Sequence, residues 1–440
     1  MFCTQNTADA DEWLSARLGA GAKRGVIAHP ASFAYPGTMK LKRVPEDFQV
    51  EEQIALEPTG GPYALYRLTK SSLGTPEAID AIVQRWRVPR GNIAFAGLKD
   101  RHALTAQFIT IDGGPRQAMR QQSLQLDYVG QVERPIHASD IAGNAFVVVV
   151  RDLAAEQLAT MEQALATVAR DGLPNYFDDQ RFGSLGESSE FIAKPWCLGD
   201  FERALWLAIA DANVHDRPDE QEQKAILREC WGNWTICKAR LEPSDRRDIV
   251  VSCLAGSRPD FRRALVQVRQ DLRSLWLAAF QSHLWNQMLA ALLRETCPGQ
   301  SLPTETIGQR DVPFFLSLTD DQRQTLHAAR LPLPSARLHL DEGPLKTLID
   351  GVMAAEGMEL RQVRVKYPRD SFFSKGERPA ISLPQSLSSE PADDELYAGR
   401  QKLTLRFTLD RGQYATILVK RVTGNGGDAF EATVEVELQT

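Results

Sequence analysis

Alternation of apolar and polar positions predicts β-strands near both ends of the chain. In the stretch 47–54 the alternation places Phe48 and Val50 on one face, as in a half-buried strand. The same pattern predicts further strands at 63–68, 93–96, 104–111, 124–132 and 145–151, and again at 403–409, 415–422 and 430–438. The predicted strands therefore fall into two groups, one in the first third of the chain and one near its C-terminal end.

Helical patterns lie between these strand regions. A first amphipathic helix is expected from Thr75, where a capping residue, a proline and an acid precede apolar residues at spacings of three and four. From about 173 to 390 helical patterns dominate, most clearly over 260–296, which Pro298 ends. Residues 384–395 have the composition of a linker. Strands, then helices, then strands predict one α+β domain interrupted by a mostly helical insertion.

The length of 440 residues agrees with more than one folding unit. We expect an N-terminal extension at 1–38, a first α+β segment at 39–172, the insertion at 173–390 and a second α+β segment at 391–440.

Composition narrows the functional classes. With 43% apolar and 25% charged residues the chain has a globular composition, and no stretch approaches the roughly 20 apolar residues that span a bilayer. Acidic residues precede any apolar run near the N-terminus, so we expect no signal peptide and a cytoplasmic location. The six cysteines form no C-x-x-C pair, and Cys230 and Cys237, seven apart, match no common zinc spacing. We expect reduced, mainly buried thiols.

Common cofactor motifs are missing from the sequence. It contains no H-E-x-x-H helix and no G-x-x-x-x-G-K-[ST] phosphate loop, so a metal or nucleotide cofactor is disfavoured. These motifs do not test for metal ligands that lie far apart in the sequence and that only the fold brings together.

Two basic islands stand out in a chain of net charge −6. Residues 85–101 hold five Lys and Arg against one Asp, and residues 361–378 hold six against two acids. Such islands are either nucleic-acid-binding surfaces or ordinary solvated faces.

A predicted loop at 97–103 carries four ionisable side chains between two apolar strands. This loop belongs to six segments that, in this order, resemble the TruD family of pseudouridine synthases. Each segment alone is weak evidence, but together they run from about residue 40 to 425. The segments are K-R-V-P-E-D-F-Q-V-E-E at 42–52, A-G-L-K-D-R-H-A-L-T-A-Q at 96–107, G-N-A-F at 143–146, N-Y-F-D-D-Q-R-F-G at 175–183, F-Q-S-H-L-W-N at 280–286 and Y-A-T at 414–416.

The resemblance implies a pseudouridine-synthase catalytic domain, built on a mixed, largely antiparallel sheet in two sequence segments, with the family-specific domain inserted between them. It implies an isomerase that converts a uridine of tRNA, position 13 in bacterial members, and that needs no cofactor. The expected partner is RNA, most of all tRNA. We expect no membrane association, no obligate protein partner and a monomer.

Carried over residue by residue, the resemblance makes Asp100 the catalytic carboxylate and Lys42 the basic residue beside it. Phe48, Asn144 and Tyr414 fall at positions that hold the target base; many relatives have Phe in place of Tyr414. The reaction breaks the N1–C1′ bond, turns the base and rejoins it through C5. A carboxylate could attack C1′ or C6, or remove the C2′ proton. The cationic neighbours of Asp100 in the sequence, Lys99 and Arg101, should favour its ionised form.

Alternatives accompany each assignment. Phe48 could be a core residue of its strand, and Asn144 could shape a turn after Gly143. The segment 175–183 is more typical of a structural element than of a site, and residues 276–289 should be core packing. The second functional class is a non-catalytic RNA-binding protein or RNA chaperone, although such a protein has no need for the carboxylate of the loop. A glycoside hydrolase would require two facing acids, and no pair has a privileged place.

Overall fold

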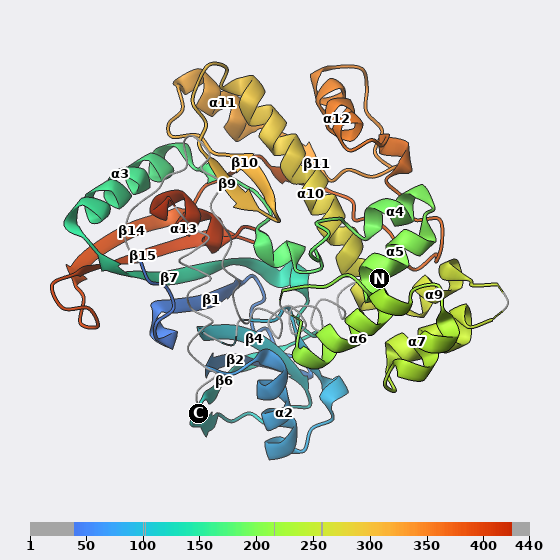
Figure 1. The fold of residues 1–440 in the computed structure, drawn as a ribbon. Coiled ribbons are helices and arrows are strands. Elements are labelled where there is room, and N and C mark those ends of the chain that lie inside the picture. The colour runs from blue at the N-terminus through green and yellow to red at the C-terminus, as the bar shows by residue number, and fades with distance from the viewer. Residues whose placement is uncertain (1–38, 100, 102, 215, 257, 425–440) are drawn as a thin grey trace. The chain divides into compact units, whose positions relative to one another are not determined.

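The computed structural model describes residues 39–99, 101, 103–214, 216–256 and 258–424, which form two compact units. The described part of the first unit comprises segments 39–173 and 382–424, and the second unit comprises 174–381. The first unit is built on a large sheet and the second is mostly helical (Figure 1). The predicted α+β class is therefore confirmed. The extension expected at 1–38 and the strand expected at 430–438 lie outside the described residues.

In the part of the chain that is described, the first unit contains a nine-stranded mixed sheet with the order β14-β15-β7-β1-β4-β2-β6-β5, to which β3 adds by pairing with β4. Every pair is antiparallel except β1 with β4. The strands are β1 (Phe48–Ile54), β2 (Tyr63–Ser71), β3 (Ile93–Phe95), β4 (Leu104–Asp112), β5 (Met119–Gln121), β6 (Leu124–Val132), β7 (Ile141–Leu153), β14 (Gln385–Asp393) and β15 (Gln401–Asp410).

Helix α2 (Thr75–Trp86) covers the β2–β4–β6 end of the sheet. Proline follows Thr75 at the start of the helix, as the sequence predicts, and the apolar face carries Ile79 and Ile82. Both isoleucines pack in one core with Tyr66 and Leu68 of β2. Burial of such side chains contributes about 1.5 to 3 kcal/mol each, so this helix is fixed to the sheet beside the loop that follows β3.

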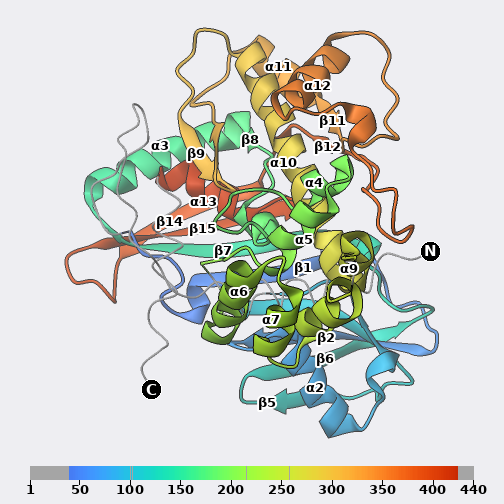
Figure 2. The same cartoon turned by 45° about the vertical axis from the view of Figure 1, so that its right-hand side comes forward.

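At the other end of the sheet lie α3 (Ala155–Asp171) and α13 (Ala415–Thr423), as Figure 2 shows. The prediction of a strand at 415–422 is wrong, because these residues form α13. β-Branched residues favour a strand, but the apolar positions Ala415, Leu418, Val419 and Val422 recur at three and four, and Gly424 ends the helix in the left-handed conformation.

The second unit ends before its predicted limit at 390. Residues 384–395 are not a linker: most of them form β14, which pairs with β15 at the edge of the sheet. Because β14 has one neighbour and is exposed along most of its length, its sequence shows no apolar alternation and has the polar composition of a loop. The chain leaves the first unit at 173/174 and returns at 381/382.

The second unit is organised around α10, a long helix with most of its side chains buried. The continuous helix expected over 260–296 is two helices, α9 and α10, separated at Val268 and Arg269, whose backbones are extended. Across the described residues, every helix is too short or too polar to span a bilayer. The helices are α4 (Ala193–Leu198), α5 (Phe201–Ile209), α6 (Pro218–Cys230), α7 (Trp234–Arg240), α8 (Asp245–Ile249), α9 (Phe261–Gln267), α10 (Gln270–Thr296), α11 (Asp320–Ala328) and α12 (Pro344–Ala355). Short strands are β8 (Leu173–Pro174), β9 (Thr304–Ile307), β10 (Arg310–Pro313), β11 (Arg330–Pro332), β12 (Glu377–Pro379) and β13 (Ile381–Ser382).

The segment 175–183 is structural over its first half, as expected. The buried amide of Asn286 on α10 accepts the backbone N–H of Phe177 at 2.9 Å and donates to its carbonyl at 2.8 Å. The hydroxyl of Tyr176 donates to the carbonyl of Pro313 at 2.8 Å. These bonds satisfy buried backbone groups and attach the segment to α10 and β10. Residues 276–289 of α10 are core packing, which confirms that prediction.

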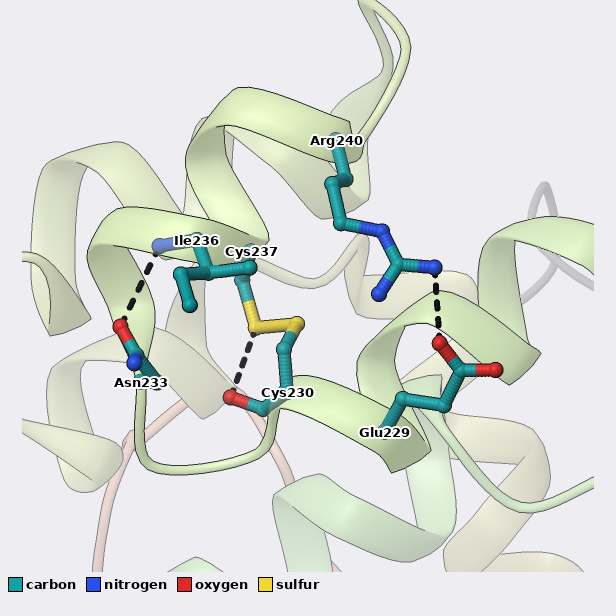
Figure 3. Close-up of a disulfide and its surroundings, with 6 residues drawn as sticks. All are labelled: Glu229, Cys230, Asn233, Ile236, Cys237 and Arg240. Atoms are coloured by element: carbon teal, nitrogen blue, oxygen red, sulfur yellow. Dashed lines mark hydrogen bonds and ion pairs between the residues drawn. A yellow bond between two sulfur atoms is a disulfide. The ribbon is translucent and has the colours of Figure 1, made fainter.

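Two cysteines of the second unit form a disulfide, Cys230–Cys237, with Cα atoms 5.6 Å apart (Figure 3). The expectation of reduced thiols is wrong for this pair. Asn233 caps α7 by accepting the N–H of Ile236, and the short turn before it folds α7 back against the end of α6. A spacing of seven gives no hint of this return, because it is not a recurrent motif. Cys197, Cys253 and Cys297 are free thiols, and Cys3 lies outside the described residues.

Candidate active site

The segment 40–48 is folded around the buried carboxylate of Asp47. Its Oδ2 accepts the backbone N–H of Arg43 at 2.9 Å and of Val44 at 3.2 Å. From β7, Arg151 donates through Nε to both carboxylate oxygens at 2.9 Å. A buried carboxylate requires such partners, and together they close the turn before β1. The acid of the P-E-D-F motif is thus a structural residue that fixes its neighbours.

Lys42 and Phe48 are brought together by this turn. The Nζ atom of Lys42 lies 4.2 Å from the centroid of the Phe48 ring, a cation–π contact. The backbone of Lys42 has φ 51°, in the left-handed region that costs a non-glycine residue about 1 kcal/mol, so the turn imposes this conformation. Phe48 is 5% exposed and packs against Phe146, with ring centroids 6.3 Å apart. Phe48 is therefore a core residue whose ring also contacts the Lys42 ammonium.

The loop after β3 is anchored by hydrogen bonds on both sides. Gln107 donates to the carbonyl of Gly97 at 3.0 Å and accepts the hydroxyl of Thr75 at 2.8 Å. The same hydroxyl oxygen accepts the backbone N–H of Lys99 at 3.1 Å, and Lys70 donates to the carbonyl of Lys99 at 3.1 Å. The backbone N–H and carbonyl of Lys99 are consequently both fixed by buried side chains.

A buried ion pair continues from this loop into the sheet. The carboxylate of Glu52 accepts the backbone N–H of Phe108 at 2.9 Å, and its other oxygen lies 3.2 Å from Nζ of Lys99. The Glu52 side chain is 0% exposed and that of Lys99 is 12% exposed. Nζ of Lys99 also donates to Oδ1 of Asn144 at 2.7 Å. Glu52, Lys99 and Asn144 form one connected group, which we call the Glu52–Lys99–Asn144 chain.

Strand register explains why these groups meet. Glu52 of β1 is the direct partner of Asn144 on β7, and Phe48 is the partner of Val148. Because side chains alternate along a strand, Phe48, Glu52 and Asn144 point to the same face of the sheet. Leu409 of β15 is the other partner of Asn144. The turn after β15 leads to Tyr414, the half-buried residue that precedes α13.

Asp100 lies outside the described residues, but the structure describes the residues on either side of it. Lys99 is engaged by Glu52 and Asn144, and Arg101 pairs with Glu77. Both cations that the sequence places beside Asp100 are therefore paired with other acids.

Sequence reasoning missed Glu52 and the inward direction of Lys99. The signal was present in the alternation that places Phe48 and Val50 on one face, because continuing it by two residues puts an acid on the buried face. A buried acid in a strand requires a partner, and the lysine of the neighbouring loop is one. The bonding of Thr75 and Gln107 could not be read from sequence, since it depends on how α2 and β4 pack.

The face of the sheet that carries Phe48 and Asn144 combines cationic, aromatic and amide groups. An ammonium lies on an aromatic ring, an amide is half-buried, and buried ionic and polar groups hold both. Such groups can receive the face and edge of an unstacked nucleobase. Over the described ranges, no group of three or more His, Cys, Asp or Glu side chains is arranged to hold a metal ion.

The first basic island, 85–101, is divided by the structure. Arg90 pairs with Asp80 and Arg101 with Glu77, both at exposed positions, whereas Lys99 points inward. Exposed ion pairs contribute little free energy, so they do not prevent contact with phosphates.

The second island, 361–378, is more uniformly exposed. Arg378 is an exception, because its guanidinium lies 3.9 Å from the centroid of the Phe177 ring and donates to the carbonyl of Asn175. Among the described residues the exposed cations Arg364, Lys366, Arg369 and Lys375 have no carboxylate partner. Two exposed aromatic residues lie between them, Tyr367 and Phe372. We call residues 364–375 the basic segment.

Comparison with known proteins gives a consistent result. The family model described as tRNA pseudouridine synthase D (TruD) matches residues 33–422. A Methanocaldococcus jannaschii protein described as "Probable tRNA pseudouridine synthase D 2" is 29% identical over 398 residues, covering 88% of this chain and 92% of the relative. The "tRNA pseudouridine synthase D" of Aquifex aeolicus is 26% identical over 394 residues, covering 87% of this chain and 98% of the relative.

A solved structure from Methanosarcina mazei, whose description names tRNA pseudouridine synthase D (TruD), superposes with a TM-score of 0.70 at 21% identity. The match covers 96% of this chain and 100% of that chain. It shows that the α+β fold with its helical region is shared.

Proposed function

Because the chain belongs to the TruD family of tRNA pseudouridine synthases and is therefore an isomerase, we propose that it converts the uridine at position 13 of tRNA to pseudouridine, with Asp100 as catalytic carboxylate. The anchoring of the loop that carries Asp100 is the observation that supports this assignment most directly. Both backbone polar groups of the preceding residue, Lys99, are bonded to buried side chains. A reacting carboxylate must be held in position, and a fixed backbone is one means of doing so.

The target uridine must leave its stack before it can react, at a cost of a few kcal/mol. We assign Lys42, Phe48, Asn144 and Tyr414 to receiving it. The Lys42 ammonium lies over Phe48 on the face that also carries Asn144. Lys42 would favour the negative charge of the substrate or of the reacting carboxylate, and Asn144 would bond the edge of the base. Phe48 is 5% exposed and would act by holding the Lys42 ammonium on its ring, whereas the half-buried Tyr414 would supply an aromatic surface for the base.

The basic segment is our candidate for contact with the tRNA backbone. Its exposed cations have no carboxylate partners among the described residues, and the exposed ring of Phe372 offers a face on which a base can stack. The Arg262 guanidinium lies 4.1 Å from the centroid of the Tyr367 ring, so a base could stack only on the other face of that ring. This would place part of the recognition of RNA shape in the inserted domain.

The experiment is a single-turnover assay with an unmodified tRNA transcript. Purified wild-type protein should form pseudouridine at position 13, located by mass spectrometry of nuclease fragments. Asp100→Asn should abolish conversion while tRNA affinity stays within about tenfold, because the carboxylate acts in bond making and not in attracting phosphates. Conversion by the variant at a rate within about a hundredfold of wild type would remove Asp100 from the mechanism.

Modification of another uridine by wild type would retain the reaction and reject position 13. Binding without any conversion by wild type would instead favour the second class, a non-catalytic RNA-binding protein.

A further inference from the structure

The orientation of the Asn144 amide follows from its neighbour. A lysine ammonium has three donors and no acceptor, so the amide atom 2.7 Å from Nζ of Lys99 is the oxygen. The other end of the amide is an NH2 group with two hydrogens to donate. Within the described part of the chain no acceptor takes them, and Asn144 is only half-buried. The sheet face therefore presents a fixed donor.

We propose that the Glu52–Lys99–Asn144 chain is a polarised relay whose end, Nδ2 of Asn144, donates to a carbonyl oxygen of the target uracil and stabilises the negative charge that the base acquires during the reaction. This rests on the proposed function, since it requires a uridine to be isomerised. It assigns two further residues, Glu52 and Lys99, as positioning residues that act through Asn144.

Charge develops on the uracil carbonyls in each possible route. If the carboxylate bonds to C1′, the N1–C1′ bond breaks and its electron pair goes to the base, where O2 and O4 share the charge. If the carboxylate removes the C2′ proton, the pair left on C2′ forms a C1′–C2′ double bond as the base departs with the N1–C1′ pair. If it bonds to C6, the electron pair of the C5–C6 double bond moves toward O4. A donor held against O4 is favourable in all three, and a donor held against O2 is favourable in the first two.

The buried ion pair strengthens this donor. The Lys99 ammonium draws electron density from the Asn144 carbonyl, which makes the amide hydrogens more positive, because linked hydrogen bonds polarise one another. Lys99 is mostly buried, and the carboxylate of Glu52 on β1 lies 3.2 Å from its ammonium. A buried charge requires an opposite charge nearby, and Glu52 supplies it. The acid thus holds the ammonium in place, and the ammonium keeps the amide oriented and polarised.

The relay also bears on the choice of base. Uracil has carbonyl acceptors at positions 2 and 4, whereas cytosine has an amino donor at position 4. If Asn144 faces O4, a cytosine would bring two donors together, and the site would reject it at a cost set by the two donors left without acceptors.

The first test replaces the NH2 donor of Asn144 by an acceptor. Asn144→Asp keeps the size of the side chain and the pairing with Lys99, but replaces the donor by an acceptor. We expect kcat to fall by a factor of about 100 to 1,000, with KM for tRNA within about threefold, since removal of one such donor costs about that much. A kcat within about threefold of wild type would overturn the proposal. A wild-type protein that forms no pseudouridine would instead reject the proposed function.

The second test changes the substrate atom. Two tRNA transcripts carry sulfur in place of O4 or of O2 at the modified uridine, because sulfur accepts hydrogen bonds weakly. We expect one of the two sulfur substitutions to slow conversion by wild type about tenfold. The rate of Asn144→Leu should not change with the same substitution, because this variant has no donor to lose. Equal sensitivity of the two proteins to both sulfur substitutions would overturn the contact, and a purely structural role of Asn144 would give that result.

The third test separates charge from orientation. The double variant Glu52→Gln with Lys99→Gln removes both charges while leaving an amide that can donate to Asn144. We expect kcat to fall about tenfold with KM unchanged, and Lys99→Arg to retain more activity than the double variant. A double variant with wild-type kcat would overturn the role of the charged pair. Lys99→Arg keeps a positive charge, so an activity no higher than that of the double variant would also overturn the role of the charged pair. This holds whether or not the double variant folds.

The matched control for the third test is Glu51→Gln with Arg67→Gln. These changes remove an exposed ion pair that joins β1 to β2, and kcat should stay within about threefold of wild type. A fall in kcat as large as that of the double variant would show that any ion pair of this sheet supports activity, and would overturn the specific role of Glu52 and Lys99.

Discussion

At the scale of single residues, the molecule uses buried charged groups to attach elements to one another. Asp47 with Arg151 joins the turn before β1 to β7, and Glu356 joins the end of α12 to α4 and α10. In each case a carboxylate receives several charge-assisted hydrogen bonds, which is the arrangement that makes burial of an ion tolerable.

Glu356 gives a pH-dependent prediction. Hydrogen bonds from His283, followed by Lys194, lower the pKa of Glu356 to about 2. Since the folded-state pKa is below the ordinary value of about 4.3, its stabilisation is complete above that value and disappears as pH falls toward about 2. Glu356→Gln should lower the free energy of unfolding by about 2 kcal/mol near neutral pH, with a smaller effect at about pH 3. Calorimetric Tm values of both proteins at the two pH values measure this.

The control for that measurement is Glu359→Gln. Glu359 is an exposed acid that pairs with Arg361 nearby, and its change should shift stability by less than about 0.5 kcal/mol. A Tm difference between wild type and Glu356→Gln as large in acid as at neutral pH would contradict the assigned role of the carboxylate.

The sequence predicts some of the side-chain contacts of the candidate site. Lys42 and Phe48 are expected at one site, and the structure brings them into contact. Glu52 lies within the first family motif, but sequence assigns it no role, because an acid at the end of an alternating strand is usually solvated. Its partner Lys99 comes from a loop far away in sequence, so only tertiary packing shows that this acid is buried.

At the scale of elements, most strands and α2 could be predicted because their apolar periodicity is regular. The exceptions are elements whose burial differs from the usual case. α13 is rich in β-branched residues and is buried along most of its length, so its helical periodicity is obscured. β14 is an exposed edge strand and shows no periodicity. Composition alone classifies the first as a strand and the second as a linker.

The disulfide between α6 and α7 should stabilise the second unit. Closing so short a loop restricts the unfolded chain by about 2 to 3 kcal/mol in the chain-entropy account. Cys230→Ser with Cys237→Ser should lower the Tm of the unit by several degrees, and a reducing agent should lower that of wild type similarly. Alkylation and mass measurement before and after reduction counts the paired thiols. Cys253→Ser is the control for removal of a buried thiol. Complete alkylation of the folded, unreduced protein would contradict the pairing.

The basic segment should supply salt-dependent affinity for tRNA. Changing Arg364, Lys366 and Arg369 together to Ala should weaken binding and flatten the dependence of log K on log salt by roughly 0.7 to 0.9 for each phosphate that is no longer bound. The matched control changes Arg203, Arg240 and Lys346, three cations of the same unit that are paired with carboxylates. Filter binding at several salt concentrations measures both. An unchanged slope in the first variant would mean that the segment does not touch RNA.

The aromatic residues of the segment test a different contribution. Tyr367 and Phe372 carry no charge, and Arg262 already covers one face of the Tyr367 ring. Replacement of the two aromatic residues by Ala should reduce affinity by about 1 to 3 kcal/mol per stacked base without altering the salt slope. A flatter slope with these variants would indicate that they support the loop and do not stack on bases.

At the scale of the whole molecule, the sequence order of strands, helices and strands corresponds to two compact units, the first of which is discontinuous. The reaction class could be predicted because the six segments occur in the order of the family, and the family match confirms it. The limits of the second unit could not be predicted to within a few residues, since they depend on which strands pair across the interruption.

The ends of the second unit lie next to each other, so a short linker can bridge them. The backbone N–H of Asn175 donates to the carbonyl of Ala380 at 2.9 Å, and the Asn175 amide donates to the carbonyl of Pro379. Replacing residues 176–379 with a short glycine–serine linker should leave the first unit folded but reduce conversion of tRNA more than about a hundredfold. Circular dichroism checks the fold, and the single-turnover assay checks conversion. A folded truncated protein with wild-type rates would show that the second unit does not read the substrate.

The discontinuity of the first unit also has a consequence for the nascent chain. β7 ends at Leu153, but β15, its neighbour in the sheet, begins at Gln401, about 250 residues later. At about 5 to 20 residues per second, a ribosome takes roughly 10 to 50 seconds to make that interval. During this time β7, with four consecutive valines at 147–150, can pair with β1 but not with β15, so one of its edges stays open. A translating cell must therefore keep a long apolar strand edge from aggregating, and a chaperone that binds the nascent chain over this interval would meet that need.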